Sequence, residues 1–327
     1  MDSRPDPSRP VVDLRDGYPT ILVAVNGGAS GWQALDWAAA ECAVRGTRLC
    51  IVHVVNDTSP MFDPLGGLAY AWFSEGDRER ATQVLDEAAR RARLVAPDIL
   101  VTTRLEMGSA AARVRNADRG DQLIVVGRGR TKRLGLGSTH SRIARRARGP
   151  VAVVELDPVR RFGPSAGRVV LGIDEPAAPV SALVYAFQAA SRRGVGLTII
   201  RAGAAGPDAA RRANERWSLR DSRQLAFDDA ISGYGNAFPN VDVRCRFVGD
   251  AAGPALVAES DAAALLVFGA QPPSRLRGAR LSSVARCVLR WARTSVVIIR
   301  TPQTAGLARA APRCGKGLAT LGAPTDA

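Results

Sequence analysis

Apolar residues along this chain follow two alternating patterns. Short runs, such as the one that begins at Ile21, consist mainly of β-branched and other apolar residues, which is typical of buried strands. Longer segments, such as Trp32–Arg45, carry an apolar residue at every third or fourth position, as an amphipathic helix does. Apolar strands that alternate with helices predict a mainly parallel sheet covered by helices on both faces.

The same alternation continues to about residue 300. Further strands are predicted over Leu49–Val55, Ile99–Leu105, Leu123–Val126 and Val151–Glu155, and a polar helix over Asp77–Val95 follows a longer loop. In the second half a polar helix is predicted over Asp208–Ser232 and the last strand over Val296–Arg300. The predicted fold class is α/β, with a doubly wound five-stranded parallel sheet in each half.

Three blocks of the sequence occur twice. The run Ile21–Asn26 is echoed by Val169–Asp174 at an offset of 148 residues. LIVVG from Leu123 is similar to LLVFG from Leu265 at an offset of 142, and ARRARGPVAVV from Ala144 is similar to LRWARTSVVII at an offset of 145. Steady offsets over three blocks indicate a tandem duplication with a few insertions or deletions.

The repeat divides the chain into two domains. We expect the first domain over residues 18–156, a linker over 157–167 and the second domain over 168–301. Residues 1–17 and 302–327 are rich in Pro, Ala, Gly or charged residues and are predicted to be disordered. A length of 327 residues suits two domains of about 150 residues each.

Composition narrows the class of protein. A hydrophobic content of 46% with 23% charged residues indicates a globular chain. No apolar run reaches the roughly 20 residues of a membrane span, and the first residues lack the apolar core of a secretory signal. The five cysteines are scattered and only two histidines are present, which argues against a disulfide framework and a zinc site. We therefore expect a cytoplasmic protein with reduced thiols, no membrane contact and no metal-ligating residues.

The net charge of +14 raises the question of nucleic-acid binding. Nearly all of the positive charge is arginine, which a GC-rich coding sequence would produce by itself. Acid-free basic stretches recur over Arg128–Arg148 and Arg275–Arg293, with Arg145/Arg290 and Arg148/Arg293 at equivalent positions. The chain has no aromatic RNA-binding motif, so the sequence favours a solvated basic helix face over a nucleic-acid partner.

Ligands of an open parallel sheet lie beyond the carboxyl ends of its strands, so the segments that leave strands one and four are the candidate site. Glycines there allow a close backbone approach, and a Ser or Thr helix cap beside free amides suits an anion. The candidate phosphate-binding residues are Asn26, Gly27, Gly127, Arg128, Gly129, Gly137, Ser138 and Thr139. A glycine turn and an ordinary helix cap, with Ser138 or Thr139 as the cap residue, explain the same residues equally well.

The VVG strand end, the LGST helix start and the PVAVV strand that follows resemble the universal stress protein family. The resemblance covers roughly residues 19–155 and 168–300. It implies domains with strand order 3-2-1-4-5 that pair through their fifth strands into an intramolecular pseudo-dimer, with further homodimerisation open. It also implies a stress-responsive binding role and an ATP site with Mg²⁺, with the adenine near Val25 and Val52.

Both halves depart from the family's ATP motif, which has an aspartate after strand one and a loop G-x2-G-x9-G-(S/T). In the first half Asn26 stands at the aspartate position, and Gly127 to Gly137 spans ten positions where the family has thirteen. Arg130 replaces the second glycine. The basic residues of this loop could replace lost backbone donors with charge; they are Arg128, Arg130, Lys132 and Arg133.

The second half retains the aspartate and the loop length that the first half lacks. Asp174 is retained, and Gly269 to Ser282 spans the thirteen positions of the family pattern. However, Pro272 and Ser282 replace the second and third glycines, while Ser283 is kept. Because proline removes a backbone donor and Ser282 disfavours a positive φ, we expect this degenerate second site not to bind nucleotide.

Other kinds of site are not supported by the sequence. The first turn, GGASG, lacks the dinucleotide-binding spacing, a GK[ST] loop is absent, and no nucleophile elbow appears. His140 is interpreted as a helix first-turn residue and His53 as a packed core or sheet-face residue, while Cys42 and Cys50 are interpreted as small core residues. We expect no enzyme. The two functional hypotheses are a stress-responsive module with a degenerate ATP-type site in the first domain and a nucleotide-independent protein-interaction scaffold.

Overall fold

The computed structural model describes the two halves and leaves out the chain ends and several loops. The described residues are 20–55, 59–62, 68–71, 75–118, 120, 122–129, 138–155, 165–173, 180–202, 222–248, 251–270 and 282–300. The disorder expected for residues 1–17 and 302–327, and most of the expected linker, lie outside these ranges.

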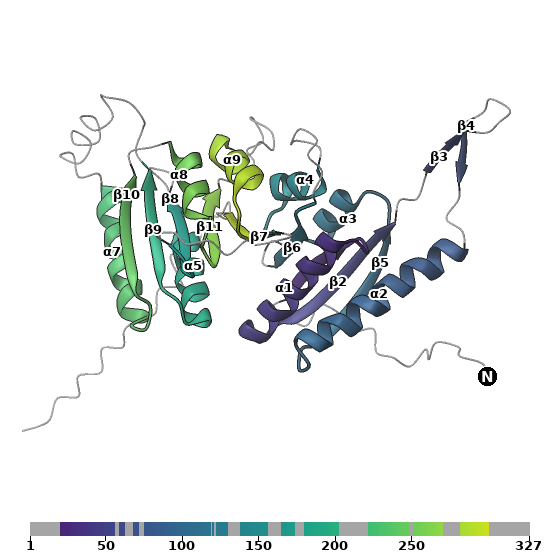
Figure 1. Cartoon of the computed structure of the whole chain (residues 1–327), viewed down its shortest axis with the longest axis horizontal. Helices are drawn as coiled ribbons and strands as arrows, with labels where there is room; N and C mark the ends of the chain where they lie inside the picture. The colour runs from purple at the N-terminus through teal and green to yellow at the C-terminus, as the bar shows by residue number, and fades with distance from the viewer. Residues whose placement is uncertain are drawn as a thin grey trace, which may run out of the picture.

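The first half contains the predicted alternation of strands and helices. Its elements are β1 (Thr20–Val25), α1 (Ala29–Arg45), β2 (Arg48–Val55), β3 (Ser59–Phe62), β4 (Leu68–Ala71), α2 (Glu75–Val95), β5 (Val101–Met107), α3 (Ala110–Ala117), β6 (Leu123–Gly127), α4 (Thr139–Arg146) and β7 (Val151–Val154). Strands β3 and β4 pair as an antiparallel hairpin where the sequence predicted only a long loop, and this hairpin projects away from the domain (Figure 1).

The second half repeats the plan of the first. Its elements are β8 (Val169–Ile173), α5 (Val180–Arg193), β9 (Leu197–Ala202), α7 (Ser222–Ala237), β10 (Val243–Val248), α8 (Ala252–Glu259), β11 (Leu265–Ala270), α9 (Ser283–Trp291) and β12 (Val296–Arg300). The polar helix expected over Asp208–Ser232 corresponds to α7, which lies further along the chain; the segment 203–221 is outside the described residues.

The two halves form one sheet of ten strands in the order β10-β9-β8-β11-β12-β7-β6-β1-β2-β5. Each half therefore has the predicted order 3-2-1-4-5, and every pair within a half is parallel. The fifth strands, β7 and β12, pair antiparallel across the middle, with Val153 opposite Val296 and Val151 opposite Ile298 (Figure 1). The predicted pseudo-dimer within one chain is confirmed.

Some element boundaries differ from the sequence prediction. Helix α1 begins at Ala29, ahead of the predicted Trp32, because Gly28 ends the turn after β1 and its carbonyl accepts the first helical bonds. Strand β5 begins at Val101 and not at Ile99, since the amide of Ile99 still bonds to Ala96 in the turn that follows α2. The apolar pattern locates these elements correctly, and local hydrogen bonds decide where each one begins.

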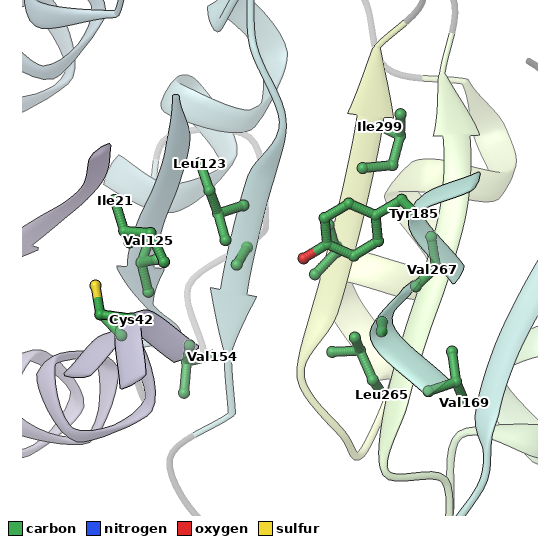
Figure 2. Packing of buried hydrophobic residues seen from close by; sticks show 14 of the residues in the cluster. Ile21, Cys42, Leu123, Val125, Val154, Val169, Tyr185, Leu265, Val267 and Ile299 are labelled. Carbon is green, nitrogen blue, oxygen red and sulfur yellow. The ribbon is translucent and has the colours of Figure 1, made fainter. Parts of the chain in front are cut away.

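Alternate residues of the strands enter two apolar layers, one on each face of the sheet. One layer lies under α1, α2 and α5 and holds residues of both halves, such as Val125 and Val267 (Figure 2). The opposite layer lies under α3, α4, α8 and α9 and includes Val126, Val153 and Ile298. Cys42 and Cys50 are buried in these layers, as predicted, and burial raises the pKa of the Cys42 thiol to about 12.

The seam between the halves is part of both layers. Val151, Val153, Val296 and Ile298 have no exposed surface, so pairing removes the edges that each five-stranded sheet would otherwise expose. Burying a valine or isoleucine side chain contributes roughly 1.5–3 kcal/mol. Among the helices that the structure describes, none combines the length and the apolar character that a membrane crossing requires.

Candidate functional site

The candidate site lies where the chain leaves β1 and β6 in opposite directions. Ala24 of β1 is the partner of Val126 of β6, so the two strands end side by side. From β1 the chain continues through α1 to β2, whereas from β6 it continues through α4 to β7 on the other side. The α1 and α4 helices cover opposite faces. This is the topological switch point at which open α/β sheets bind ligands.

The side chain of Asn26 shapes the turn after β1. Asn26 Oδ1 accepts a hydrogen bond from the Gly28 amide at 3.1 Å, which forms a local side-chain turn. Gly27 has φ of 73°, a conformation that glycine adopts without strain. Gly28 is the N-cap of α1, and no side chain caps this helix start. The asparagine at the family's aspartate position therefore holds the turn that precedes α1.

The exit from β6 packs directly on the first turn of α1. A Cβ atom at Gly127 would lie 2.0 Å from the carbonyl oxygen of Ser30, so only glycine fits at this position. The amide of Arg128 then bonds to the Val154 carbonyl at 2.8 Å and fixes the loop to β7. Gly127, Arg128 and Gly129 are thus held beside the start of α1.

Ser138 is the N-cap of α4, which decides between the two cap residues that the sequence offered, Ser138 and Thr139. Its Oγ accepts a hydrogen bond from the Ser141 amide at 3.4 Å and donates one to Ser141 Oγ at 2.9 Å. Thr139, the first helical residue, is exposed at this end of the helix. Gly137 and the basic residues Arg130, Lys132 and Arg133 lie outside the described residues.

His140 is a first-turn residue of α4, as expected. Its Nε2 lies 3.2 Å from Ser138 Oγ. Burial, together with the positive charge of Arg128, lowers the pKa of His140 to about 4. The imidazole is therefore neutral at physiological pH and can bond to the cap without adding charge to the site.

The Arg128 side chain points to the second domain. Its guanidinium forms an ion pair with Glu155 and donates a hydrogen bond to the carbonyl of Ala292, which is the C-cap of α9. A cation at a helix C-terminus is favourable because the last carbonyls there lack helical partners. The side chain is only 12% exposed, and burial lowers its pKa. This arginine therefore links the β6 exit to the other half of the protein.

Val25 and Val52, which the family resemblance placed near the adenine, do not face one another. Val25 belongs to the core layer under α1 and Val52 to the opposite layer, and both are buried. Their side chains therefore lie on opposite faces of the sheet. The ring of His53 donates from Nδ1 to the Val25 carbonyl at 2.9 Å, which confirms His53 as a sheet-face residue and ties the ends of β1 and β2.

The second half has a different helix start at the equivalent place. Ser282, and not Ser283, caps α9, since Ser282 Oγ accepts from the Ala285 amide at 3.1 Å. Its φ of −60° shows that this position needs no glycine here. The aligned residue of the first half, Gly137, has no side-chain oxygen, so there the next residue, Ser138, caps the helix. Gly269 lies in β11, while Asp174 and Pro272 are outside the described residues.

Two comparisons with known proteins bear on this geometry. The model of the Universal stress protein family matches residues 17–155 and, a second time, residues 166–300. The chain belongs to the universal stress protein family. Among curated universal stress proteins, Rv1996 of Mycobacterium tuberculosis is 30% identical over 306 residues, covering 86% of this chain and 95% of its own length. Rv2005c of the same species is 28% identical over 286 residues, covering 86% of this chain and 96% of its own.

The fold is shared with solved universal stress proteins. A crystal structure of one from Archaeoglobus fulgidus covers 86% of this chain and 98% of its own, with a TM-score of 0.64 and 18% identity. A putative member from Pseudomonas aeruginosa has a TM-score of 0.53 at 17% identity, covering 87% of this chain and 94% of its own. At such identities the likeness concerns the arrangement of elements.

One cluster in this universal stress protein was not singled out from the sequence. Glu41 on α1 is buried and forms ion pairs with Arg45 of its own helix and with Arg193 on α5 of the other domain. Arg45 also donates to the Tyr185 hydroxyl at 2.6 Å, and its guanidinium lies 4.8 Å from that ring's centroid. Burial raises the pKa of Tyr185 to about 12, so its hydroxyl stays protonated.

The sequence repeat does relate two members of this cluster to one another. Arg45 and Arg193 are the first residues of the repeated segments RGTRLCIVH and RGVGLTIIR, so they are equivalent positions of the two domains. Glu41 therefore forms ion pairs with two equivalent arginines, one from each domain. Within the described residues there is also no group of three or more His, Cys, Asp or Glu side chains that could hold a metal ion.

Proposed function

We propose that the first domain binds the phosphates of an adenine nucleotide beyond the carboxyl ends of β1 and β6, and that the protein acts as a stress-responsive binding module. The observation that carries this proposal is the contact of Gly127 with the first turn of α1. A Cβ at Gly127 would lie 2.0 Å from the Ser30 carbonyl oxygen. The backbone of the β6 exit therefore packs directly on the backbone of α1 at the switch point, with no side chain between them. Such a surface suits a polyanion beside helix N-termini.

The residues present fit ATP with Mg²⁺ only in part. Glycines and the capped start of α4 supply backbone donors, and the family membership supports a nucleotide. Asn26 offers a neutral oxygen that already accepts from the Gly28 amide, and the Arg128 guanidinium is engaged at the seam. Mg²⁺ keeps several ligands as water and phosphate oxygens, so here it would be held chiefly by the nucleotide. The role of this chain's residues is to bind and orient the phosphates.

The test separates nucleotide binding from folding. Thr139→Glu places a carboxylate at the exposed start of α4, where it repels a phosphate but slightly stabilises the helix. Ser283→Glu makes the equivalent change at the start of α9. In calorimetric titrations with ATP and Mg²⁺, we expect the wild type and Ser283→Glu to bind with one site per chain. Thr139→Glu should lose about tenfold in affinity or more, without a lower melting temperature. Equal affinities in all three would contradict the proposal.

A second candidate function is a scaffold that acts without nucleotide. It is favoured by Arg128, because the cation that could have neutralised a phosphate is bonded to Glu155 and Ala292. In that case ATP would give no saturable heat with any variant, although all of them melt cooperatively. Binding that is saturable and sensitive to Thr139→Glu excludes this second function.

A further inference from the structure

The two faces of the ten-stranded sheet differ in charge. On α1 and α2 most arginines have acidic neighbours, as in the pairs Arg91–Asp36 at 2.6 Å and Arg90–Glu87 at 2.7 Å. The opposite face is covered by α3, α4, α8 and α9. Within the described bounds of these four helices the only acidic residue is Glu259, which is buried and bonds to Ser165 and Arg246.

Exposed arginines line the two central helices of that face. They are Arg142 and Arg146 on α4 with Arg148 just beyond it, and Arg286 and Arg290 on α9 with Arg293 just beyond it. We call these six residues the α4–α9 arginines. Arg293 has an acidic neighbour, Asp261 Oδ1, at 3.4 Å. A bias of the coding sequence explains arginine in place of lysine, but it does not explain why acidic residues are frequent on α1 and α2 and scarce on α3, α4, α8 and α9.

The fold brings the two helices to the same seam. Each helix follows a fourth strand and leads into β7 or β12, which pair at the centre of the sheet (Figure 1). Arg128 of the first domain reaches the C-cap of α9, and Arg300 of the second domain reaches the Ala144 carbonyl on α4. The α4–α9 arginines therefore belong to the two helices that meet this seam, where their shared positive charge favours an extended anion.

An exposed aromatic residue accompanies the arginines. Trp291 at the end of α9 is 57% exposed, and the Arg290 guanidinium lies 5.0 Å from its ring centroid. A flat apolar surface beside cations is the arrangement on which unpaired bases stack. The other large apolar residues exposed in the described part of the chain lie on α1, α2 and α5 or near β5, so this face lacks the apolar stripe of a membrane-binding helix.

We propose that the α4–α9 arginines and Trp291 form a binding surface for single-stranded nucleic acid. The arginines would neutralise consecutive phosphates, and Trp291 would stack on an unpaired base. None of these seven residues is a member of the proposed nucleotide site. The sequence alone disfavoured a nucleic-acid partner because the chain has no aromatic RNA-binding motif beside its basic stretches. The fold places both stretches on one face with an exposed indole.

The test measures fluorescence anisotropy of labelled single-stranded RNA, single-stranded DNA and duplex DNA of mixed sequence. Salt is varied from about 50 to 200 mM. We expect single strands of either kind to bind more tightly than duplex, with an affinity that falls steeply as salt rises. The RNA and DNA arms identify which single strand is preferred. Binding of duplex as tight as that of both single strands would overturn the proposal.

Matched variants localise the surface. Arg142, Arg146, Arg286 and Arg290 are changed together to Glu in one variant, and the exposed α2 residues Arg78, Arg80, Arg90 and Arg93 in a control of equal net charge. We expect the first variant to lose about a hundredfold or more in affinity and the control only a few-fold. Trp291→Ala should lose about tenfold for single strands and little for duplex.

Three further results would overturn the proposal. Equal losses in the two charge variants would mean that overall charge alone governs binding. An unchanged affinity of Trp291→Ala for single strands would show that Trp291 does not stack on a base. Binding to acidic phospholipid vesicles with none to nucleic acid would assign the face to a membrane surface. Thermal melting of every variant confirms that it is folded before its affinity is compared.

Discussion

Among single residues, Gly127 is one at which the fold leaves no room for a side chain. A Cβ at this position meets the Ser30 backbone, which cannot swing aside as a flexible side chain could. We predict that Gly127→Ala lowers the free energy of unfolding by about 2 kcal/mol or more. Gly233 in α7 is the control, because a Cβ there meets nothing within 4 Å and alanine should stabilise the helix by about 0.5–1 kcal/mol. Urea unfolding measures both, and the same sign for both changes would contradict the packing of β6 on α1.

The protonation of His140 makes the free energy of unfolding depend on pH. Its pKa is about 4 in the folded protein and near 6.5 when the chain is unfolded, so the unfolded chain binds the proton first as the pH falls. The free energy of unfolding should therefore fall between pH 6.5 and 4, and this group adds no further change below pH 4. His140→Asn should flatten that part of the pH profile in urea titrations, whereas His53→Gln, which leaves His140 in place, should retain it. An unchanged slope in His140→Asn would refute the assignment.

At the level of elements, α1 and α5 are joined by a buried ion-pair cluster. Glu41 is 3% exposed and lies between Arg45 and Arg193, so removing it leaves two arginines without their counter-charge. We predict that Glu41→Ala lowers the free energy of unfolding by about 3–5 kcal/mol. A triple variant in which Glu41, Arg45 and Arg193 all become Leu or Met should recover most of that loss, because no buried charge remains. If Glu41→Ala unfolds like the wild type, the cluster does not join the domains.

The sequence predicted the elements and their order well, and the helix starts less well. Unbroken apolar runs such as Leu123–Val126 specify buried parallel strands, because a strand with helices on both faces has no polar side. The repeat then indicated two copies of one domain. The α9 start at Ser282 was not predicted, since the family alignment compared it with a glycine and only the observed cap shows that its oxygen is used.

The site was predictable as a set of segments and not as a set of contacts. Topology alone brings the exits of β1 and β6 together, so the turn at Asn26 and the loop at Gly127 could be paired in advance. The direction of the Arg128 side chain could not, because its acceptor, Ala292, is 164 residues away in the chain. The same holds for Arg45 and Tyr185, which are 140 residues apart.

On the scale of the whole molecule, the antiparallel pair β7–β12 makes the two domains one sheet. Val153 has no exposed surface and lies opposite Val296 in this pair. Val153→Pro removes a ladder donor and should cost about 4 kcal/mol or more, while Val153→Ala loses only the side chain, at about 2 kcal/mol. Urea unfolding compares the two, and small-angle scattering of the proline variant should show an expanded chain. Equal losses and equal dimensions would mean that the seam does not hold the domains together.

We propose one nucleotide site in the molecule, beyond the carboxyl ends of β1 and β6 in the first domain. Photolabelling with an azido derivative of ATP, followed by peptide mapping, tests this most directly because it reports the domain as well as the binding. We predict label on peptides from residues 18–156, prevented by excess ATP and strongly reduced in Thr139→Glu but not in Ser283→Glu. Label that maps to residues 168–301, or label that excess ATP does not prevent, would contradict the central claim.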